Sequence, residues 1–131
     1  MRFANEYNTT GAGPDECARR RRVLDDECRS AGREPESLPL SLMRTCVVAS
    51  DEADLRERLG RFLEVTETDS SVDDFIGGVG PDDLIGTVDQ VAERLRRYER
   101  AGVTRVMCQH LVHEDLEMVE LLGRELRPAV A

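Results

Sequence analysis

A ten-residue apolar segment places the strongest constraint on the fold of this chain. Residues 40–49 (LSLMRTCVVA) are mostly aliphatic, and at the end of the segment successive positions are apolar. Successive side chains of a strand point to opposite faces, so this pattern predicts a strand that is buried on both faces. Strands of that kind belong to parallel sheets covered by helices. The segment therefore predicts an α/β fold.

Helical and extended segments alternate on either side of this strand. The pattern predicts a short strand over residues 3–8, a helix over about 14–31, a helix over about 51–63, a helix that begins at Thr87, a strand over 103–109 and a last helix over about 114–126. Residues 64–83 have no clear period and carry several glycines, which predicts an irregular excursion. Alternating strands and helices imply βα units and parallel strands.

Residues at the expected helix ends support these boundaries. Pro14 suits the first position of a helix, and Gly32 and Gly102 stand where a helix is expected to stop. Thr87 and Gln90 have the spacing of a capping box, in which the side chain at the fourth residue returns to the backbone N–H of the first.

Three parallel strands are few for a complete domain of this class, and they leave both edges of the sheet open. The 131 residues fit one compact domain. A full (β/α)₈ barrel needs about 250 residues. We therefore interpret residues 1–131 as a single domain that forms part of something larger.

The charge of the chain excludes several classes of function. It carries 27 acidic and 18 basic residues, a net charge of −9, which repels nucleic-acid backbones. All the basic residues are arginine, so neither a lysine Schiff base nor a P-loop lysine can be present. No apolar run approaches the roughly 20 residues of a membrane span, and the N-terminus does not resemble a signal peptide. We expect a cytoplasmic protein that binds neither nucleic acid nor membrane.

The four cysteines, Cys17, Cys28, Cys46 and Cys108, are spread without a CxxC pair. We expect them to be reduced and mostly buried. Cys17 and Cys28 lie eleven residues apart, close to about three helical turns, so both can share one buried helix face.

Four segments resemble the luciferase-like flavin and deazaflavin (F420) oxidoreductases, in the order in which that family has them. They are residues 6–11 (EYNTTG), 31–35 (AGREP) leading into 41–43 (SLM), 85–91 (IGTVDQV) and 98–110 (YERAGVTRVMCQH). Val88 stands where the family usually has proline. The resemblance covers nearly the whole chain, and the F420-dependent branch is the most similar.

The resemblance implies that the chain is the C-terminal part of a (β/α)₈ barrel, about its last three βα units, with three parallel strands and flanking helices. It implies F420 as the cofactor, with FMN as the alternative, and a small organic molecule as the substrate. The early strands, which carry much of the substrate pocket in the family, are expected upstream of Met1, together with a glycine-rich stretch that helps to hold the cofactor phosphate.

In barrels the functional groups lie where the strands end. That rule selects Asn8, Thr9 and Thr10, whose amide and hydroxyl groups are candidates for cofactor binding. It also selects Gly86 and Thr87 at a helix N-terminus, where free amides favour an anion. Asn and Thr are also ordinary turn residues, and Thr87 already has a capping role.

The last strand supplies two further candidates. Gln109 is expected to contact the substrate, and His110 to act as a hydrogen-bond partner or proton carrier. An alternative for His110 is a purely structural bond to the backbone at the strand end. Cys108, His110 and His113 have a spacing that invites a metal, but no fourth ligand is evident, and we expect none.

Two functions follow. The first is a segment of an F420- or FMN-dependent oxidoreductase or monooxygenase that transfers hydride between cofactor and substrate and is incomplete alone. The second is a non-catalytic half-barrel that self-associates or complements a separate N-terminal half.

Overall fold

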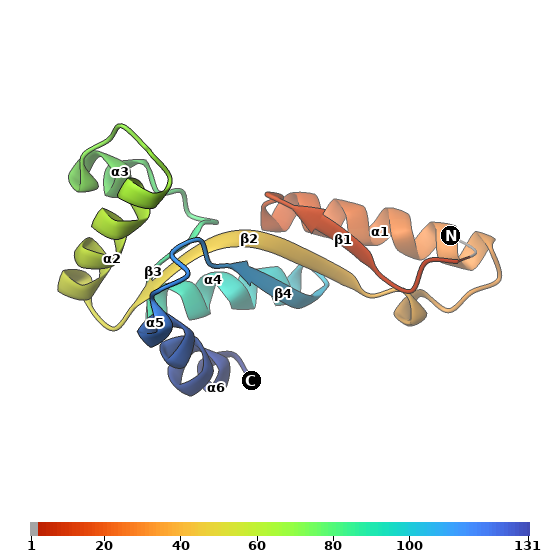
Figure 1. The fold of residues 1–131 in the computed structure, drawn as a ribbon. Helices are drawn as coiled ribbons and strands as arrows, with labels where there is room; N and C mark the ends of the chain where they lie inside the picture. The colour runs from red at the N-terminus through yellow and green to blue at the C-terminus, as the bar shows by residue number, and fades with distance from the viewer. Residues whose placement is uncertain (1–2) are drawn as a thin grey trace. The chain divides into compact units, whose positions relative to one another are not determined.

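A computed structural model describes residues 3–131 (Figure 1). It is an α/β fold with parallel strand pairing and flanking helices, as the sequence predicts. In chain order the elements are β1 (Tyr7–Thr10), α1 (Pro14–Ser30), a 3-10 turn η1 (Pro35–Ser37), β2 (Leu40–Ala49), α2 (Glu52–Val65), α3 (Val72–Gly78), β3 (Leu84–Thr87), α4 (Val88–Arg100), β4 (Val103–Gln109), α5 (Leu116–Leu121), a π-helical turn η2 (Leu122–Leu126) and α6 (Arg127–Val130).

The strands pair around β2. β1 pairs in parallel with its first half, with Tyr7 opposite Leu40, and β3 pairs in parallel with its second half, with Cys46 opposite Leu84. β4 also pairs with β2, which gives a four-stranded sheet. The chain divides into two compact units, residues 1–44 with 96–108 and residues 45–95 with 109–131, and the boundaries fall within β2, α4 and β4.

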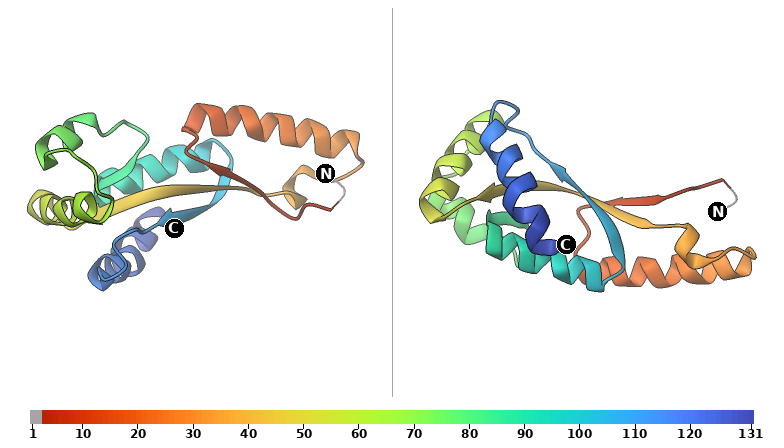
Figure 2. Two further views of the ribbon diagram at one scale, coloured as in Figure 1. Left: turned by 45° about the horizontal axis from the view of Figure 1, so that its top comes forward. Right: turned by 90° about the horizontal axis from the view of Figure 1, so that it is seen from below.

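The core of the first unit lies under α1, which runs alongside β1 (Figure 2). The apolar stripe predicted for this helix was Cys17, Leu24, Cys28 and Ala31. The first three are buried in α1 as predicted, whereas Ala31 follows the helix and is exposed. Tyr98 is also buried, and its hydroxyl donates to the Ala12 carbonyl at 3.1 Å. Gly102 has a φ of +88°, the left-handed backbone that glycine adopts most easily, so it ends α4 as the sequence indicates.

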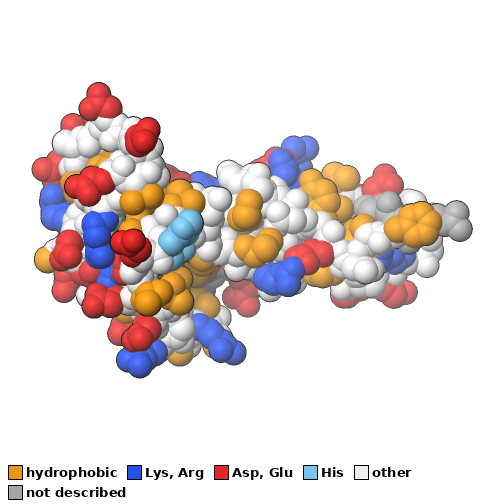
Figure 3. Space-filling view, viewed as in Figure 1, with side chains coloured by type: hydrophobic (Ala, Val, Ile, Leu, Met, Phe, Trp, Pro, Cys, Tyr) orange, Lys and Arg blue, Asp and Glu red, His pale blue; other side chains and the backbone are white. Residues whose placement is uncertain are grey.

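The core of the second unit joins α2 to the second half of β2. Val47 and Ala49 pack with Leu55, Leu59 and Phe62 in one cluster, against which residues of α3 and β3 also pack. Phe62 and Phe75 bring α2 and α3 together, with ring centroids 5.8 Å apart. On the face seen in Figure 3, acidic side chains are exposed around these two helices, with arginine side chains among them.

The structure corrects four expectations. The first strand covers Tyr7–Thr10 instead of residues 3–8, because its pairing with β2 begins at Tyr7. The region expected to be irregular contains α3, capped by Ser71, and β3 adds a fourth strand to the three expected. The last helix begins after Asp115, which caps it, and a π-helical turn that contains Gly123 interrupts it.

Of the four cysteines, Cys17, Cys28 and Cys46 are buried and Cys108 is partly buried, and none forms a disulfide. Among the helices that the structure describes, none combines the length and the apolar character needed to cross a membrane.

Candidate functional site

The first group of predicted site residues, Asn8, Thr9 and Thr10, lies within β1 and not after it. Alternation along the strand gives these residues different surroundings. Thr9 is buried, and its hydroxyl accepts a hydrogen bond from the Arg20 guanidinium on α1. Asn8 and Thr10 are exposed, and the Asn8 amide donates to the Ser41 hydroxyl at 2.9 Å. Only Asn8 and Thr10 are therefore placed to meet a ligand from solvent.

Gly86 and Thr87 lie at the junction of β3 and α4, and the side chain of Gln90 folds over them. Gln90 Oε1 accepts the Thr87 backbone N–H at 3.0 Å, which is one half of the predicted capping box. A Cβ at Gly86 would lie 2.4 Å from the same oxygen. Glycine at position 86 thus makes room for the cap. An anion that bound the Thr87 amide would have to replace the Gln90 oxygen.

Gln109 and His110 lie at the end of β4, in the second unit. Gln109 is exposed, and its Oε1 accepts a hydrogen bond from the Thr45 hydroxyl at 3.1 Å. His110 is partly buried, with Nε2 3.2 Å from the backbone carbonyl of Asp115. One ring nitrogen of His110 therefore makes the structural bond to the backbone that the sequence analysis gave as the alternative role of this residue.

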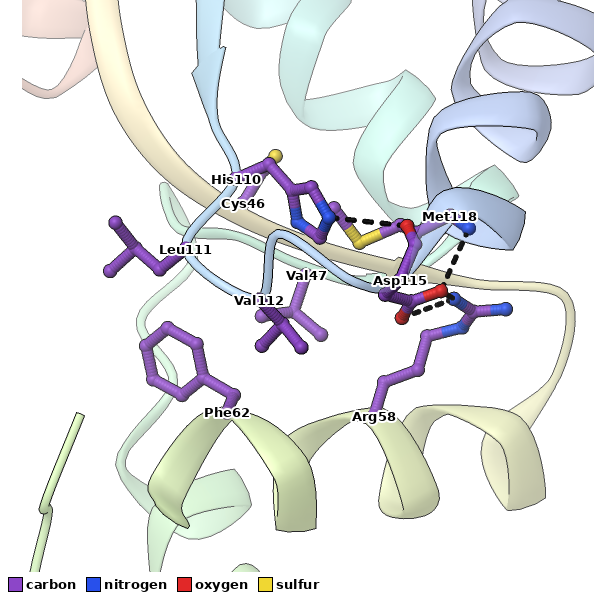
Figure 4. A pocket seen from close by; sticks show the side chains of 9 residues that line it. All are labelled: Cys46, Val47, Arg58, Phe62, His110, Leu111, Val112, Asp115 and Met118. Carbon is purple, nitrogen blue, oxygen red and sulfur yellow. Dashed lines mark hydrogen bonds and ion pairs between the residues drawn. The ribbon is translucent and has the colours of Figure 1, made fainter. Parts of the chain in front are cut away.

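His110 lines a hollow between the end of β2, α2 and the segment that leads into α5 (Figure 4). Side chains fill this hollow so closely that it has no room for a water molecule. It is therefore a packed contact and not a preformed ligand pocket. The lining residues are Cys46, Val47, Arg58, Phe62, His110, Leu111, Val112, Asp115 and Met118.

A buried ion pair stands at one side of the hollow. Arg58 on α2 is 5% exposed and Asp115 is 4% exposed, and Arg58 Nη1 lies 2.5 and 2.6 Å from the two carboxylate oxygens. Arg58 Nε also donates to Asp54 at 2.8 Å. Asp115 Oδ1 accepts the backbone N–H of Met118 at 3.0 Å and so caps α5.

The ion pair changes the acidity of its members. Burial raises the pKa of Asp115, but hydrogen bonds from Arg58 and from the Met118 N–H outweigh it, so the pKa falls below the ordinary aspartate value. Asp54 shows the same balance, and its pKa is also lowered. Both carboxylates are therefore ionised at neutral pH, and the pair is charged.

The sequence predictions do not include this pair, although the sequence carries one signal for it. Arg58 falls at helical spacing among the apolar residues Leu55, Leu59 and Phe62 of α2. An arginine inside an apolar stripe indicates a buried partner. The partner itself, 57 residues further along the chain, has no local signature.

The histidine and cysteine residues near the end of β4 do not form a metal centre. Among residues 3–131, no group of three or more His, Cys, Asp or Glu side chains could hold one metal ion.

The predicted site residues thus fall into three sets. Asn8, Thr9 and Thr10 belong to the first unit, whereas Gly86 with Thr87 and Gln109 with His110 belong to the second. No hydrogen bond within residues 3–131 joins one set to another, and each set is held by its own partners.

Comparison with solved structures shows that the fold of nearly the whole chain is similar to parts of known proteins. A coenzyme F420-dependent tetrahydromethanopterin reductase from Methanopyrus kandleri matches 98% of this chain with a TM-score of 0.71 and 18% identity. An F420-dependent secondary alcohol dehydrogenase, in complex with an F420-acetone adduct, matches 98% with a TM-score of 0.68 and 15% identity. A riboflavin lyase with modified FMN and riboflavin matches 95% with a TM-score of 0.64 and 14% identity.

All three are luciferase-like proteins. This chain has the fold of one part of such a protein. The luciferase-like fold that the sequence motifs implied is confirmed. Identities of 14–18% mean that the fold, rather than the sequence, carries the likeness.

The chain spans less than half of each matched structure, namely 46%, 44% and 38% of their lengths. No protein-family model matches the chain, and no curated protein sequence does.

Proposed function

We propose that this chain is the C-terminal segment of a luciferase-like oxidoreductase that uses F420, with FMN as the alternative cofactor. The parent reaction would be hydride transfer between the cofactor and a small organic substrate, with O₂ as co-substrate if the parent is a monooxygenase. One observation carries the proposal: 98% of the chain superposes on an F420-dependent reductase. The second matched structure is also described as F420-dependent, and the third contains modified FMN.

Each unit, taken separately, offers neutral polar groups that suit the ring of such a cofactor. The first unit offers the amide of Asn8 and the hydroxyl of Thr10, and the second offers the amide of Gln109 and the imidazole of the partly buried His110. Flavin-type rings present carbonyl and N–H groups, which such neutral partners can bind. The cofactor, when bound, would supply the electron chemistry, and these residues would orient its ring.

The junction of β3 and α4 is a candidate for the anionic part of the cofactor. A phosphate oxygen that replaced Gln90 Oε1 would keep the Thr87 N–H satisfied, and it would sit at the positive end of α4. We assign the cofactor tail to Gly86 and Thr87 on this basis.

Titration of the purified chain with F420, and separately with FMN, tests the proposal through the fluorescence of the cofactor. We expect one of them to bind with a dissociation constant in the micromolar range or higher. His110→Gln and Asn8→Ala should each weaken binding about fivefold, which is the loss of roughly 1 kcal/mol from one hydrogen bond. His113→Gln is the matched control, because His113 is exposed and outside the site. A folded chain that binds neither cofactor would refute the claim that this segment forms a cofactor site on its own.

A second candidate function is a non-catalytic half-barrel that self-associates or complements a separate N-terminal half. Within residues 3–131, β1 and β4 each pair only with β2, and open strand edges favour pairing with another chain. Light scattering on the titrated samples separates the two candidates. Binding of cofactor by a defined species supports the enzyme, and association without binding supports the half-barrel.

A further inference from the structure

The segment between β4 and α5 is held in one conformation by its own backbone. Asp115 N–H donates to the Val112 carbonyl at 2.9 Å, and Leu116 N–H donates to the Glu114 carbonyl at 3.0 Å. The second bond closes a three-residue turn around Asp115, whose φ of −81° and ψ of 74° are those of an inverse γ-turn. Leu111 and Val112 pack against the core of the second unit. The direction of the Asp115 carbonyl is therefore fixed.

Hydrogen bonds of its side chain also hold Asp115 in place. The Asp115 carboxylate binds Arg58 through both oxygens and accepts the Met118 N–H, so its side chain joins α2 to the first turn of α5. Arg58 is itself held by Asp54, one turn earlier on α2. Figure 4 shows the Asp115 carbonyl directed toward His110 while its carboxylate is directed toward Arg58.

This arrangement determines which nitrogen of His110 carries the proton. A carbonyl oxygen only accepts hydrogen bonds, so the ring nitrogen that faces it, Nε2, must be the donor. In the neutral imidazole the other nitrogen, Nδ1, then has the lone pair. Within residues 3–131 the structure gives Nδ1 no hydrogen-bond partner.

We propose that Arg58 and Asp115 are positioning residues for His110. They hold the Asp115 carbonyl against Nε2, fix the Nε2–H tautomer, and leave Nδ1 as the atom that accepts a hydrogen bond from a bound cofactor or substrate. The tautomer follows from the chain alone, whereas the role of Nδ1 toward a ligand rests on the proposed function.

The tautomer can be measured without a ligand, by nitrogen-15 NMR of the full chain at about pH 8.5, where an ordinary histidine is neutral. The chain has only two histidines, and His113 is exposed. We expect His110 to show a fully protonated Nε2 and a fully unprotonated Nδ1, and His113 to show shifts averaged between tautomers. His113→Gln assigns the signals. A protonated Nδ1, or shifts of His110 averaged like those of His113, would overturn the proposal.

Variants test whether the ion pair sets the tautomer. Arg58→Met with Asp115→Asn removes both charges together and keeps a side chain that can cap α5. In this double variant we expect the nitrogen-15 shifts of His110 to move toward the tautomer-averaged values expected for His113. In the single variant Arg58→Lys, which keeps Asp115 and a positive charge, we expect the His110 shifts to lie between those of the double variant and those of the unsubstituted chain. Arg56→Met is the matched control, because Arg56 lies on the same helix and pairs with the exposed Asp73. A folded double variant with unchanged His110 shifts would show that the pair does not position the ring.

Cofactor titration then separates the two claims. If the tautomer is as expected but neither F420 nor FMN binds, the assignment of a cofactor site to this segment fails and the positioning role stands. If a cofactor binds and the Nδ1 shift of His110 moves on binding, both stand. If a cofactor binds and that shift stays unchanged, Nδ1 is not the acceptor, and this part of the inference fails alone.

Discussion

At the scale of single residues, one position along a strand decides what a side chain can do. Thr9 and Thr10 are chemically identical neighbours, yet Thr9 is 2% exposed and bonded to Arg20, whereas Thr10 faces solvent. The sequence assigns both to a loop, where the distinction does not arise. In the strand, alternation gives Thr9 a structural role and leaves Thr10 as the candidate for ligand contact.

Gly86 offers a test at this scale. Gly86→Ala places a Cβ 2.4 Å from Gln90 Oε1, so the Gln90 side chain must move and release the Thr87 N–H. We expect a loss of about 1 kcal/mol in the free energy of unfolding, which is typical of a lost cap. Urea unfolding followed by circular dichroism measures it.

Gly60→Ala is the matched control for this substitution. Gly60 lies inside α2 with nothing within 4 Å of its Cβ position, so alanine should raise stability by about 0.5–1 kcal/mol. Equal stabilisation by the two alanines would contradict the contact between Gly86 and Gln90.

At the scale of elements, a buried ion pair joins two helices that lie far apart in the sequence, α2 and α5. The lowered pKa of Asp115 gives this link a defined dependence on pH. Because the pKa in the folded state lies below the unfolded value, the contribution to stability is complete above about pH 4. It is lost as the pH falls through the folded pKa.

Asp115→Asn tests this dependence. At pH 7 the variant should lose about 3 kcal/mol or more, because the buried charge of Arg58 loses its closest partner and keeps only Asp54 at 2.8 Å and the exposed Glu117 at 3.9 Å. The difference from the unsubstituted chain should shrink as the pH falls below about 4. Urea unfolding at several pH values measures it. Asp73→Asn, which breaks an exposed pair with Arg56, should change stability by at most about 1 kcal/mol at any pH.

The elements that sequence analysis predicted well are those with a strong local pattern. The apolar run at residues 40–49 matches β2, and the stripe of α1 matches its buried face. β3 and α3 were not predicted, because their stability comes from contacts with residues distant in the sequence. β3 has four residues and depends on pairing with β2, and α3 contains two glycines and depends on packing between Phe75 and Phe62.

The same distinction holds for the candidate site: features with a local sequence pattern were predicted, and contacts between distant residues were not. The capping role of Gln90 follows from spacing, and the contact of His110 with the backbone was one of its two foreseen roles. The pairing of Arg58 with Asp115 could not be foreseen, because nothing local indicates which residue a buried arginine meets 57 positions away.

At the scale of the whole molecule, open sheet edges and net charge would act in opposite directions on an association of chains. β1 and β4 each have one strand partner within residues 3–131, which favours pairing between chains. The net charge of −9 opposes it, because copies of the chain repel each other.

Salt shifts this balance in a predictable direction. Screening shortens the range of repulsion from about 30 Å at 0.01 M to about 10 Å at 0.1 M ionic strength. We expect the mean mass from light scattering to rise above the 14.7 kDa of one chain as salt is added over this range. A mass that stays at one chain at every salt and protein concentration would argue against association through the sheet edges.

The thioether of Met118 links α5 to the end of β2. Met118 is 1% exposed, and its sulfur accepts the backbone N–H of Val48 at 3.4 Å. The sulfur thus satisfies a backbone donor at the buried, apolar end of β2. Oxidation of Met118 to the sulfoxide would make the side chain bulkier and more polar, and we expect it to loosen the contact between α5 and β2.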